Sequence, residues 1–482
     1  MAFGSLEIGR RALMAQRFAM DVTSNNIANA NTAGYSRREV VLSENNPMYN
    51  SPNFNGQGSV VDKLRTFRED FFDKEIRSSV TRKNSYESDQ SILKRIETIL
   101  NEPTDDTVGV SLNEFFNAFD ELALKPESES HRDNVLGIAR NLTNKFNGTS
   151  QSLLDSRNQV LESITNIVGE ANSIIETIAS LNKGFSANKS LAANDSQTMI
   201  DKRELELEKL AKFGNVNSTV NPDGTANVYL NGINVVTGQN ATKIAIDENT
   251  NNITGEKTLS IFKVDADNNA LSKINLTGGE LGSLLQHYNV TLDDKDSSGE
   301  FSIHSQLNLL ANKFAEKVNQ ITSIGFGLDD IEPTSPARNF FESSDPNDSI
   351  INALNIKISK DVLNQPRNIP LSDKPNEPGN NKIALQIARM NEDVSFLNNN
   401  KPVEFYNNLI GKIGIRSREA ENGFKTSNLV AEQLTNQRES IIGVNLDEEA
   451  VNIVKFQQAF EAASRSLNVA NELITTIINL GK

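Results

Sequence analysis

The stretch VNIVKFQQAFEAASRSLNVANELITTIINL, residues 451–480, decides much of the fold. Its apolar side chains recur at alternating steps of three and four, the heptad spacing by which one helix packs along another. This seam consists of Ile453, Phe456, Phe460, Ala463, Leu467, Ala470, Ile474 and Ile477. The spacing predicts a long amphipathic helix with one face that requires a partner.

A second helix of this kind is predicted near the N-terminus. One row of its apolar residues recurs at steps of seven and consists of Leu6, Leu13, Met20 and Ile27, and beside it lies a row of Ile8, Ala15 and Val22. The segment 29–34 ends the pattern, and Gly34 suits a left-handed turn at a helix C-terminus. The periodicity alone fits the core of an ordinary bundle as well as an interface between copies.

Charge favours pairing of the two ends. Residues 1–38 hold five Arg against Glu7 and Asp21, a net charge of +3, whereas residues 444–482 hold five acidic and three basic residues, a net charge of −2. Opposite charges attract across a helix pair. We therefore predict that the terminal helices pair as a coiled coil and form an assembly domain.

Composition excludes several classes of protein. A chain of 482 residues with a net charge of −15 lacks the clustered basic residues that a nucleic-acid groove needs. No apolar run approaches the roughly 18 residues needed to span a bilayer, and charges interrupt the N-terminal helix, so neither membrane insertion nor a cleaved signal peptide is expected. The absence of Cys removes disulfides and thiolate sites. The absence of Trp predicts an aliphatic rather than an aromatic core.

The chain between the two ends is predicted to be helical, then β, then helical. One apolar stripe runs from Val135 to Leu181 and predicts a helix about 70 Å long. Ser111–Glu114 has the pattern of a capping box that opens a shorter helix before it. From Val216 the period changes to two, with turn residues such as Asn231–Gly232, which predicts a β module inserted as a self-contained outward unit.

The predicted fold is mainly α with a small β insertion, an elongated rod of several domains. The terminal assembly domain is assigned to residues 1–48 and 428–482. The long-helix rod is assigned to residues 49–212, 279–326 and 380–427, and the small β-rich outward module to residues 213–278 and 327–379.

No constellation of catalytic or metal-binding residues emerges. His131, His287 and His304 lie far apart in the sequence and are expected on the surface or on helix faces. Gly278–Gly282 is interpreted as a helix-start turn rather than an anion site, because Glu280 would repel a phosphate. The sequence therefore predicts no catalytic residue, no cofactor and no metal, and a protein that is not an enzyme.

Several motifs resemble those of flagellar proteins. Residues 24–37 are similar to the N-terminal signature of flagellar rod, hook and hook-associated proteins, and residues 444–473 to their C-terminal signature. Residues 111–147 and 278–285 resemble the hook-associated protein 1 family, which forms the proximal hook–filament junction. The central region is short for that family, which leaves room for one modest β module.

The resemblance implies a structural protein, exported unfolded without a cleaved signal, that forms a ring at the distal end of the hook and connects it to the filament. Its implied location is the hook–filament junction of an external or periplasmic flagellum. The implied partners are further copies, the hook protein, a second hook-associated junction protein and an export chaperone. The implied assembly interface combines the two seams with Asn25, Asn26, Asn29, Asn31, Gly34, Tyr35 and Leu446.

Two alternatives stay open from the sequence. One is a hook or distal-rod structural protein, because the terminal signatures do not separate the axial proteins from one another. The other is a peptidoglycan hydrolase carried on the same terminal helices, although the residues supply no site for it.

Overall fold

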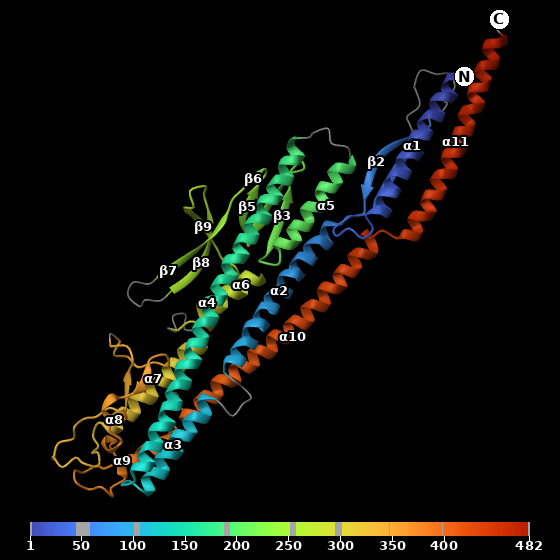
Figure 1. Ribbon diagram of the computed structural model, residues 1–482. Helices are drawn as coiled ribbons and strands as arrows, with labels where there is room; N and C mark the ends of the chain where they lie inside the picture. The colour runs from blue at the N-terminus through green and yellow to red at the C-terminus, as the bar shows by residue number, and fades with distance from the viewer. Residues whose placement is uncertain are drawn as a thin grey trace.

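A computed structural model describes residues 2–44, 58–100, 107–187, 193–250, 257–294, 301–346, 348–397 and 399–480. Figure 1 shows an elongated molecule in which long helices run side by side and both termini lie at one end. The helices are α1 (Ala2–Ala28), α2 (Asp70–Ile99), α3 (Val108–Leu124), α4 (Glu129–Ala187), α5 (Ala193–Leu210), α6 (Gly279–Gln286), α7 (Ile303–Thr322), α8 (Lys360–Leu363), α9 (Lys382–Arg389), α10 (Pro402–Ile442) and α11 (Leu446–Leu480). A π-helical turn at His287–Thr291 extends α6, and 3-10 turns lie at Pro366–Asn368 and Met390–Glu392.

The strands form four small antiparallel sheets. β1 (Arg38–Glu44) pairs with β2 (Ser59–Thr66) beside α1. A four-stranded sheet has the order β3 (Val216–Val220), β4 (Ala226–Leu230), β5 (Ile233–Thr237) and β6 (Asn240–Ala241), and a three-stranded sheet has the order β7 (Ile244–Thr250), β8 (Lys257–Val264) and β9 (Ala270–Ile274). β10 (Phe341–Ser343) pairs with β11 (Ile356–Ile358).

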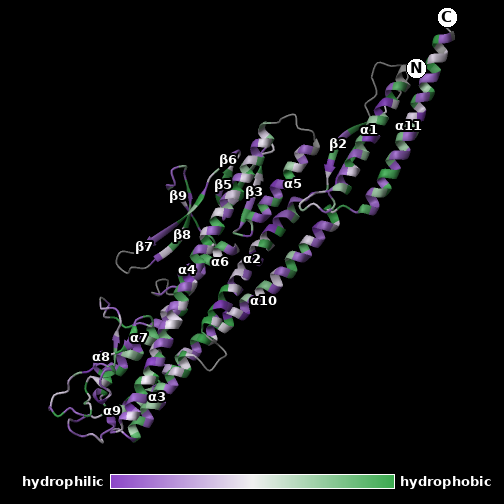
Figure 2. Ribbon diagram, viewed as in Figure 1, coloured by the Kyte–Doolittle hydropathy of each residue, from purple (hydrophilic) through white to green (hydrophobic). Residues whose placement is uncertain are grey.

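The predicted fold class is confirmed. Figure 1 shows α1 and α11 side by side at one end of the molecule, and α2, α4 and α10 forming the rod below them. Helix α11 rises from the rod while α1 descends toward it, so the two terminal helices are antiparallel. In Figure 2, hydrophobic and hydrophilic residues alternate along these helices, as one-sided apolar stripes require.

Helix α4 carries the predicted long stripe. It spans 59 residues, about 90 Å at 1.5 Å per residue, longer than the stripe alone indicated. Its buried face includes Ile164, Ala171 and Ile178, each with no exposed area. The strands β5, β6 and β7 pack on this helix. The apolar stripe of α4 is therefore the surface against which these strands pack.

Asparagine side chains of α4 also bind the β strands through hydrogen bonds to their backbone. The buried Asn182 amide donates to Ala226 O at 2.7 Å and accepts from Ala226 N at 3.0 Å. Asn172 makes the same pair of bonds with the backbone of Ile244, at 2.9 and 2.8 Å. Each amide occupies the donor and acceptor of a strand residue as a neighbouring strand would.

The β module is consequently not the self-contained insertion that the sequence predicted. Val228, Leu230 and Ile261 are fully buried within the same apolar cluster as the helices of the rod. The turn predictions themselves are confirmed: Asn231 and Gly232 have φ values of 46° and 83°, and they join β4 to β5. Local turn chemistry does not reveal that the inner face of a small sheet is covered by a distant helix.

The segment 327–379 shares no strand pairing with the sheets of 213–278 in the part of the chain that the structure describes. It packs at the far end of the rod, against α3, α7 and α9 (Figure 1). The division of the chain into domains stays a prediction, and the strand pairing supports treating these two segments separately.

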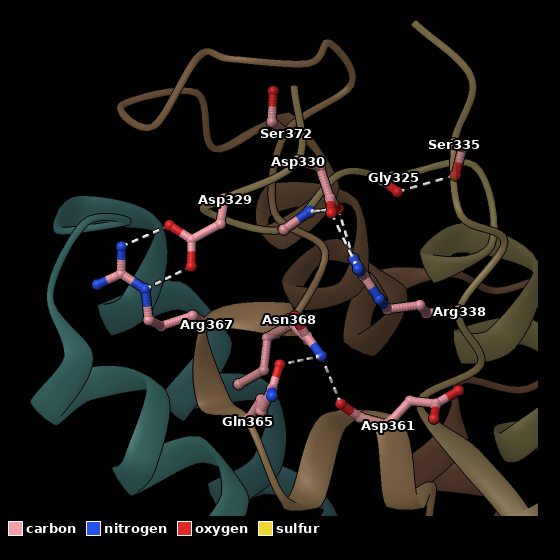
Figure 3. A network of polar contacts seen from close by, with 12 residues as sticks. Gly325, Asp329, Asp330, Ser335, Arg338, Asp361, Gln365, Arg367, Asn368 and Ser372 are labelled. Carbon is pink, nitrogen blue, oxygen red and sulfur yellow. Dashed lines mark hydrogen bonds and ion pairs between the residues drawn. The ribbon is translucent and has the colours of Figure 1, made fainter. Parts of the chain in front are cut away.

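Ion pairs and backbone contacts hold this segment in place, as Figure 3 shows. Asp329 binds Arg367 through two bonds of 2.6 and 2.5 Å. Asp330 binds Arg338 and accepts from Gly327 N at 2.6 Å. A single carboxylate that ties a side chain and a backbone amide fixes a loop without regular secondary structure.

Aromatic side chains fill the core at this end, contrary to the expected aliphatic core. Phe115 lies 4.9 Å from Phe119 and 5.1 Å from Phe314, measured between ring centroids. Phe340 and Phe341, which flank the start of β10, complete the cluster, and all five rings are fully buried. The low overall aromatic content hid this cluster because its members come from distant parts of the chain.

Helix α3 begins before the predicted capping box. Thr107 is the N-cap residue, and its hydroxyl accepts from Val110 N at 3.2 Å. Ser111, predicted to open the helix, lies inside it and is buried. The S-x-x-E pattern is common within helices, and here an earlier threonine has the extended backbone that a cap requires.

Candidate assembly site at the paired termini

Small residues line the buried side of α1. Ala15, Ala19 and Val22 are all less than 5% exposed. At Gly9 a Cβ atom would lie 3.2 Å from Cβ of Leu467 on α11, so the two helices approach closely there. Small residues allow two helix backbones to come near one another. The pair is then stabilised by close van der Waals packing rather than by burial of large side chains.

The predicted row of large residues on α1 flanks this contact. Leu6, Leu13, Met20 and Ile27 are all half-buried, neither fully covered nor exposed. Of the second row, which the sequence placed beside it, Ala15 and Val22 are buried, whereas Ile8 is 38% exposed. A half-covered stripe of large apolar side chains is therefore left on the surface of the pair.

The predicted seam of α11 is covered in the same way. Ala470 is buried, and Ile453, Phe456, Phe460, Ala463, Leu467 and Ile474 are half-buried. Leu446 is 50% exposed at the start of the helix, and the side chain of Ile477 lies outside the described residues. The structure thus brings the two predicted seams together within one chain. Their role in assembly with other copies stays a prediction.

A second apolar face of α11 has no cover. Val451, Val469 and Leu473 are 67%, 56% and 56% exposed. At 100° per residue these three lie outside the seam that meets α1, with Leu473 about 100° from Ile474. Isolated exposed apolar residues are ordinary, but a row along one helix face indicates a contact with another molecule.

The asparagine motif closes the base of the helix pair. Asn26 is fully buried, and its amide donates to Arg38 O at 2.9 Å and to Glu449 Oε2 at 3.1 Å. Its carbonyl oxygen accepts from Arg38 N at 3.1 Å and from the Tyr35 hydroxyl at 2.8 Å. Asn26 thus joins α1, the following loop and α11 through one side chain.

The other motif residues shape the turn that follows α1. The Asn29 side chain donates to Asn25 O at 2.9 Å, and the Tyr35 hydroxyl donates to Asn25 Oδ1 at 3.1 Å. Gly34 has φ +78°, as predicted, whereas Asn31 is exposed. Burial raises the pKa of Tyr35 to about 12, so the hydroxyl stays protonated and able to donate.

Opposite charges meet at the same place. Arg37 binds Glu449 and Glu448, each at 2.8 Å, and Arg37 N donates to Ile442 O at 3.0 Å. Glu449 is only 2% exposed, so its pairing with Arg37 and Asn26 is screened little by solvent. The predicted attraction between the basic N-terminal and the acidic C-terminal segment is present at this point. The sequence did not show that Glu449 is the buried member of the acidic run.

Two of the histidines take part in hydrogen bonds with side chains of other helices. His287 and His304 lie on helical segments, as one of the two expectations had it, and both are buried rather than on the surface. His304 bonds to Ser150, and His287 bonds to Asp89, which also accepts from the Ser283 hydroxyl. Because Ser283 and His287 both bond to the same carboxylate, the histidine does not activate the serine as a base would.

Two further observations concern membranes and metals. In the described ranges, no helix is long and apolar enough to cross a bilayer. Within those ranges there is also no group of three or more His, Cys, Asp or Glu side chains that could hold a metal ion.

Comparison with known proteins agrees with this geometry. The family model described as "Flagellar hook-associated protein FlgK helical domain" matches residues 93–341, more than half of the chain. The model "Flagella basal body rod protein" matches residues 6–35, and "Flagellar basal body rod FlgEFG protein C-terminal" matches residues 438–480. The last two ranges contain most of α1, and the end of α10 together with all of α11.

Relatives match over nearly the whole length. Flagellar hook-associated protein 1 of Bacillus subtilis is 26% identical over 519 residues, covering 99% of this chain and 98% of its own. The protein of the same name from Escherichia coli is 25% identical over 545 residues, covering 97% and 98%. The solved structure of the flagellar hook junction protein FlgK from Burkholderia pseudomallei has a TM-score of 0.64 at 13% identity, covering 76% of this chain and all of that chain, so the fold is shared.

A rod of helices with paired ends, both matching flagellar rod-protein families, is an axial structural protein of the flagellum. More specifically, the chain belongs to the FlgK family of flagellar hook-associated proteins. The resemblance noted in the sequence is confirmed. Its relatives carry the names of structural proteins, and its terminal domains are of the kind that assembles with other flagellar components.

Proposed function

We propose that this chain forms a ring at the distal end of the hook and joins the hook to the filament. The single observation that carries the proposal is the α1–α11 pair, which extends from the rod as an antiparallel unit with the termini at its tip (Figure 1). The proposed neighbours are further copies of the chain, the hook protein on one side and a second hook-associated junction protein on the other. Export without a cleaved signal, aided by a chaperone, is part of the same proposal.

Two partly uncovered apolar stripes support lateral packing of such pairs. The half-buried row from Leu6 to Ile27 lies on α1, and the exposed row from Val451 to Leu473 lies on α11. Burying apolar surface yields about 25 cal/mol per Å², so neighbouring pairs gain by covering both rows. The predicted interface residues would then act twice, within the chain and between chains.

The location of the chain tests this proposal. Antibody raised against the chain is applied to isolated hook–basal bodies and observed by electron microscopy with gold particles. We expect gold at the distal ends of hooks only. Gold along the whole hook, or at the rod, would support the alternative of a hook or distal-rod protein instead.

A further inference from the structure

The pair of terminal helices meets the rod at a narrow neck. The β1–β2 hairpin packs along α1 and belongs to the pair. Two covalent connections therefore cross the neck: the segment 67–69 between β2 and α2, and the link Gly443–Asn445 between α10 and α11. A Cβ atom at Gly443 would lie 2.3 Å from Glu439 O, so only glycine fits the present path of that link. Two short connections alone would let the pair swing relative to the rod.

One buried carboxylate of α5 crosses this neck. Asp201 Oδ2 accepts from Arg38 at 3.0 Å, and Asp201 Oδ1 accepts from Arg68 at 3.0 Å. Arg38 begins β1 and Arg68 follows β2, so both ends of the β1–β2 hairpin are held by the same side chain. The side chains of Asp201 and Arg38 are 7% and 1% exposed.

Arg38 connects this carboxylate to the helix pair. Its backbone N–H and C=O both bond to Asn26 of α1, and Asn26 in turn bonds to Glu449 of α11. Arg68 also binds Asp73 on α2, at 2.7 Å. A continuous path of buried polar contacts therefore runs from α11 through α1 and the hairpin to α5 and α2.

The remaining acidic residues on this face of α5 bind the rod itself. Glu204 binds Arg77 of α2 at 2.7 Å, and Glu208 binds Arg438 of α10 at 2.9 Å. Positions 201, 204 and 208 have the spacing of one helix face. Helix α5 is thus fixed to the rod by two carboxylates and to the neck by the third.

We propose that Asp201 fixes the orientation of the terminal helix pair relative to the rod. Without it, Arg68 keeps Asp73 and Arg38 keeps the Thr198 hydroxyl, but the carboxylate that joins the two guanidinium groups is lost from a poorly hydrated place. The pair, with the β1–β2 hairpin, then pivots on Gly443–Asn445 and on the segment 67–69. A fixed direction in every copy is what a closed ring of identical subunits requires.

A distance measurement in the full-length chain tests whether Asp201 fixes this orientation. The chain has no cysteine, so Thr426→Cys on α10 and Ser466→Cys on α11 place two spin labels at exposed positions without other changes. Double electron–electron resonance then reports the distribution of distances between rod and helix pair in dilute solution. We expect one narrow distribution in the otherwise unchanged chain and a broad or multiple distribution after Asp201→Asn.

Glu204→Gln is the matched control, because it removes a largely buried carboxylate one turn away whose ion pairs are with Arg77 of α2 and Arg203 of its own helix. We expect its distribution to stay narrow, and circular dichroism to show equal helix content in both variants. A narrow distribution in Asp201→Asn, an equal broadening in Glu204→Gln, or a broad distribution in the unchanged chain would each overturn the proposal. Loss of helix content in Asp201→Asn alone would also overturn it, since Asp201 would then be needed for folding rather than direction.

Discussion

Leu467→Asp is expected to separate the two terminal helices. Leu467 is half-buried and packs against Gly9, where the backbones of α1 and α11 come close. Placing a carboxylate there costs on the order of several kcal/mol, because it must be desolvated without a basic partner. Hydrogen exchange in the isolated chain measures the effect, and amides of both terminal helices should lose protection together while those of α4 keep it.

Leu473→Asp is the control on the same helix. The residue type and the substitution are identical, but Leu473 lies outside the seam of α11 and is 56% exposed. We expect exchange in the isolated chain to be unchanged by it. If Leu467→Asp leaves both terminal helices protected, or if Leu473→Asp exposes them equally, the pairing described here is wrong.

Removal of residues 213–278 is expected to destabilise the rod, and this is the second large effect. Replacing them by a short Gly/Ser linker would uncover the face of α4 that includes Ala171, Ile175 and Ile178. Burial of each isoleucine contributes about 1.5–3 kcal/mol, so several exposed together can exceed the stability of a whole domain. The melting temperature followed by circular dichroism, together with the soluble yield, measures the loss.

Replacing the exposed turn Ala266–Asn269 by Gly/Ser provides the control for that deletion. This turn joins β8 to β9 at the surface, and its residues are exposed. We expect a melting temperature close to that of the unchanged chain. A deletion variant that melts like the unchanged chain would restore the view of the β module as a separate insertion.

The helices could be predicted from the sequence because their signals are periodic and local. The seam from Ile453 to Ile474, the stripe of α4 and the turn at Asn231–Gly232 each depend on spacing or on a single backbone preference. Such features depend on residues that are close together in the sequence. The fold class, the terminal pairing and the hairpin turn therefore follow from the amino-acid sequence alone.

The choice of contact face on α1 was not accessible in the same way. Two apolar rows lie side by side on that helix, and the larger residues, beginning with Leu6, gave the stronger heptad signal. The structure buries Ala15 and Ala19 instead, on a helix whose backbone comes close to α11, as it does where Gly9 meets Leu467. Hydrophobicity alone does not distinguish tight packing of small residues from looser packing of large ones.

The polar contacts at the neck could not be predicted from the sequence for another reason. Asp201, Arg38 and Glu449 come from segments far apart in the chain, and a single sequence gives no signal that they meet. The position of Asp201 depends on where α5 packs against α4. Tertiary contacts of this kind appear only when the helices are placed in space.

The partition of flagellin tests most directly the claim that paired terminal helices carry assembly. In a strain whose only copy of this chain lacks residues 444–482, α11 is absent and α1 has no partner. Flagellin is then measured by immunoblot in the medium and on sheared cells. The account predicts complete hooks without filaments and flagellin free in the medium, and filaments attached to hooks in normal number would contradict it.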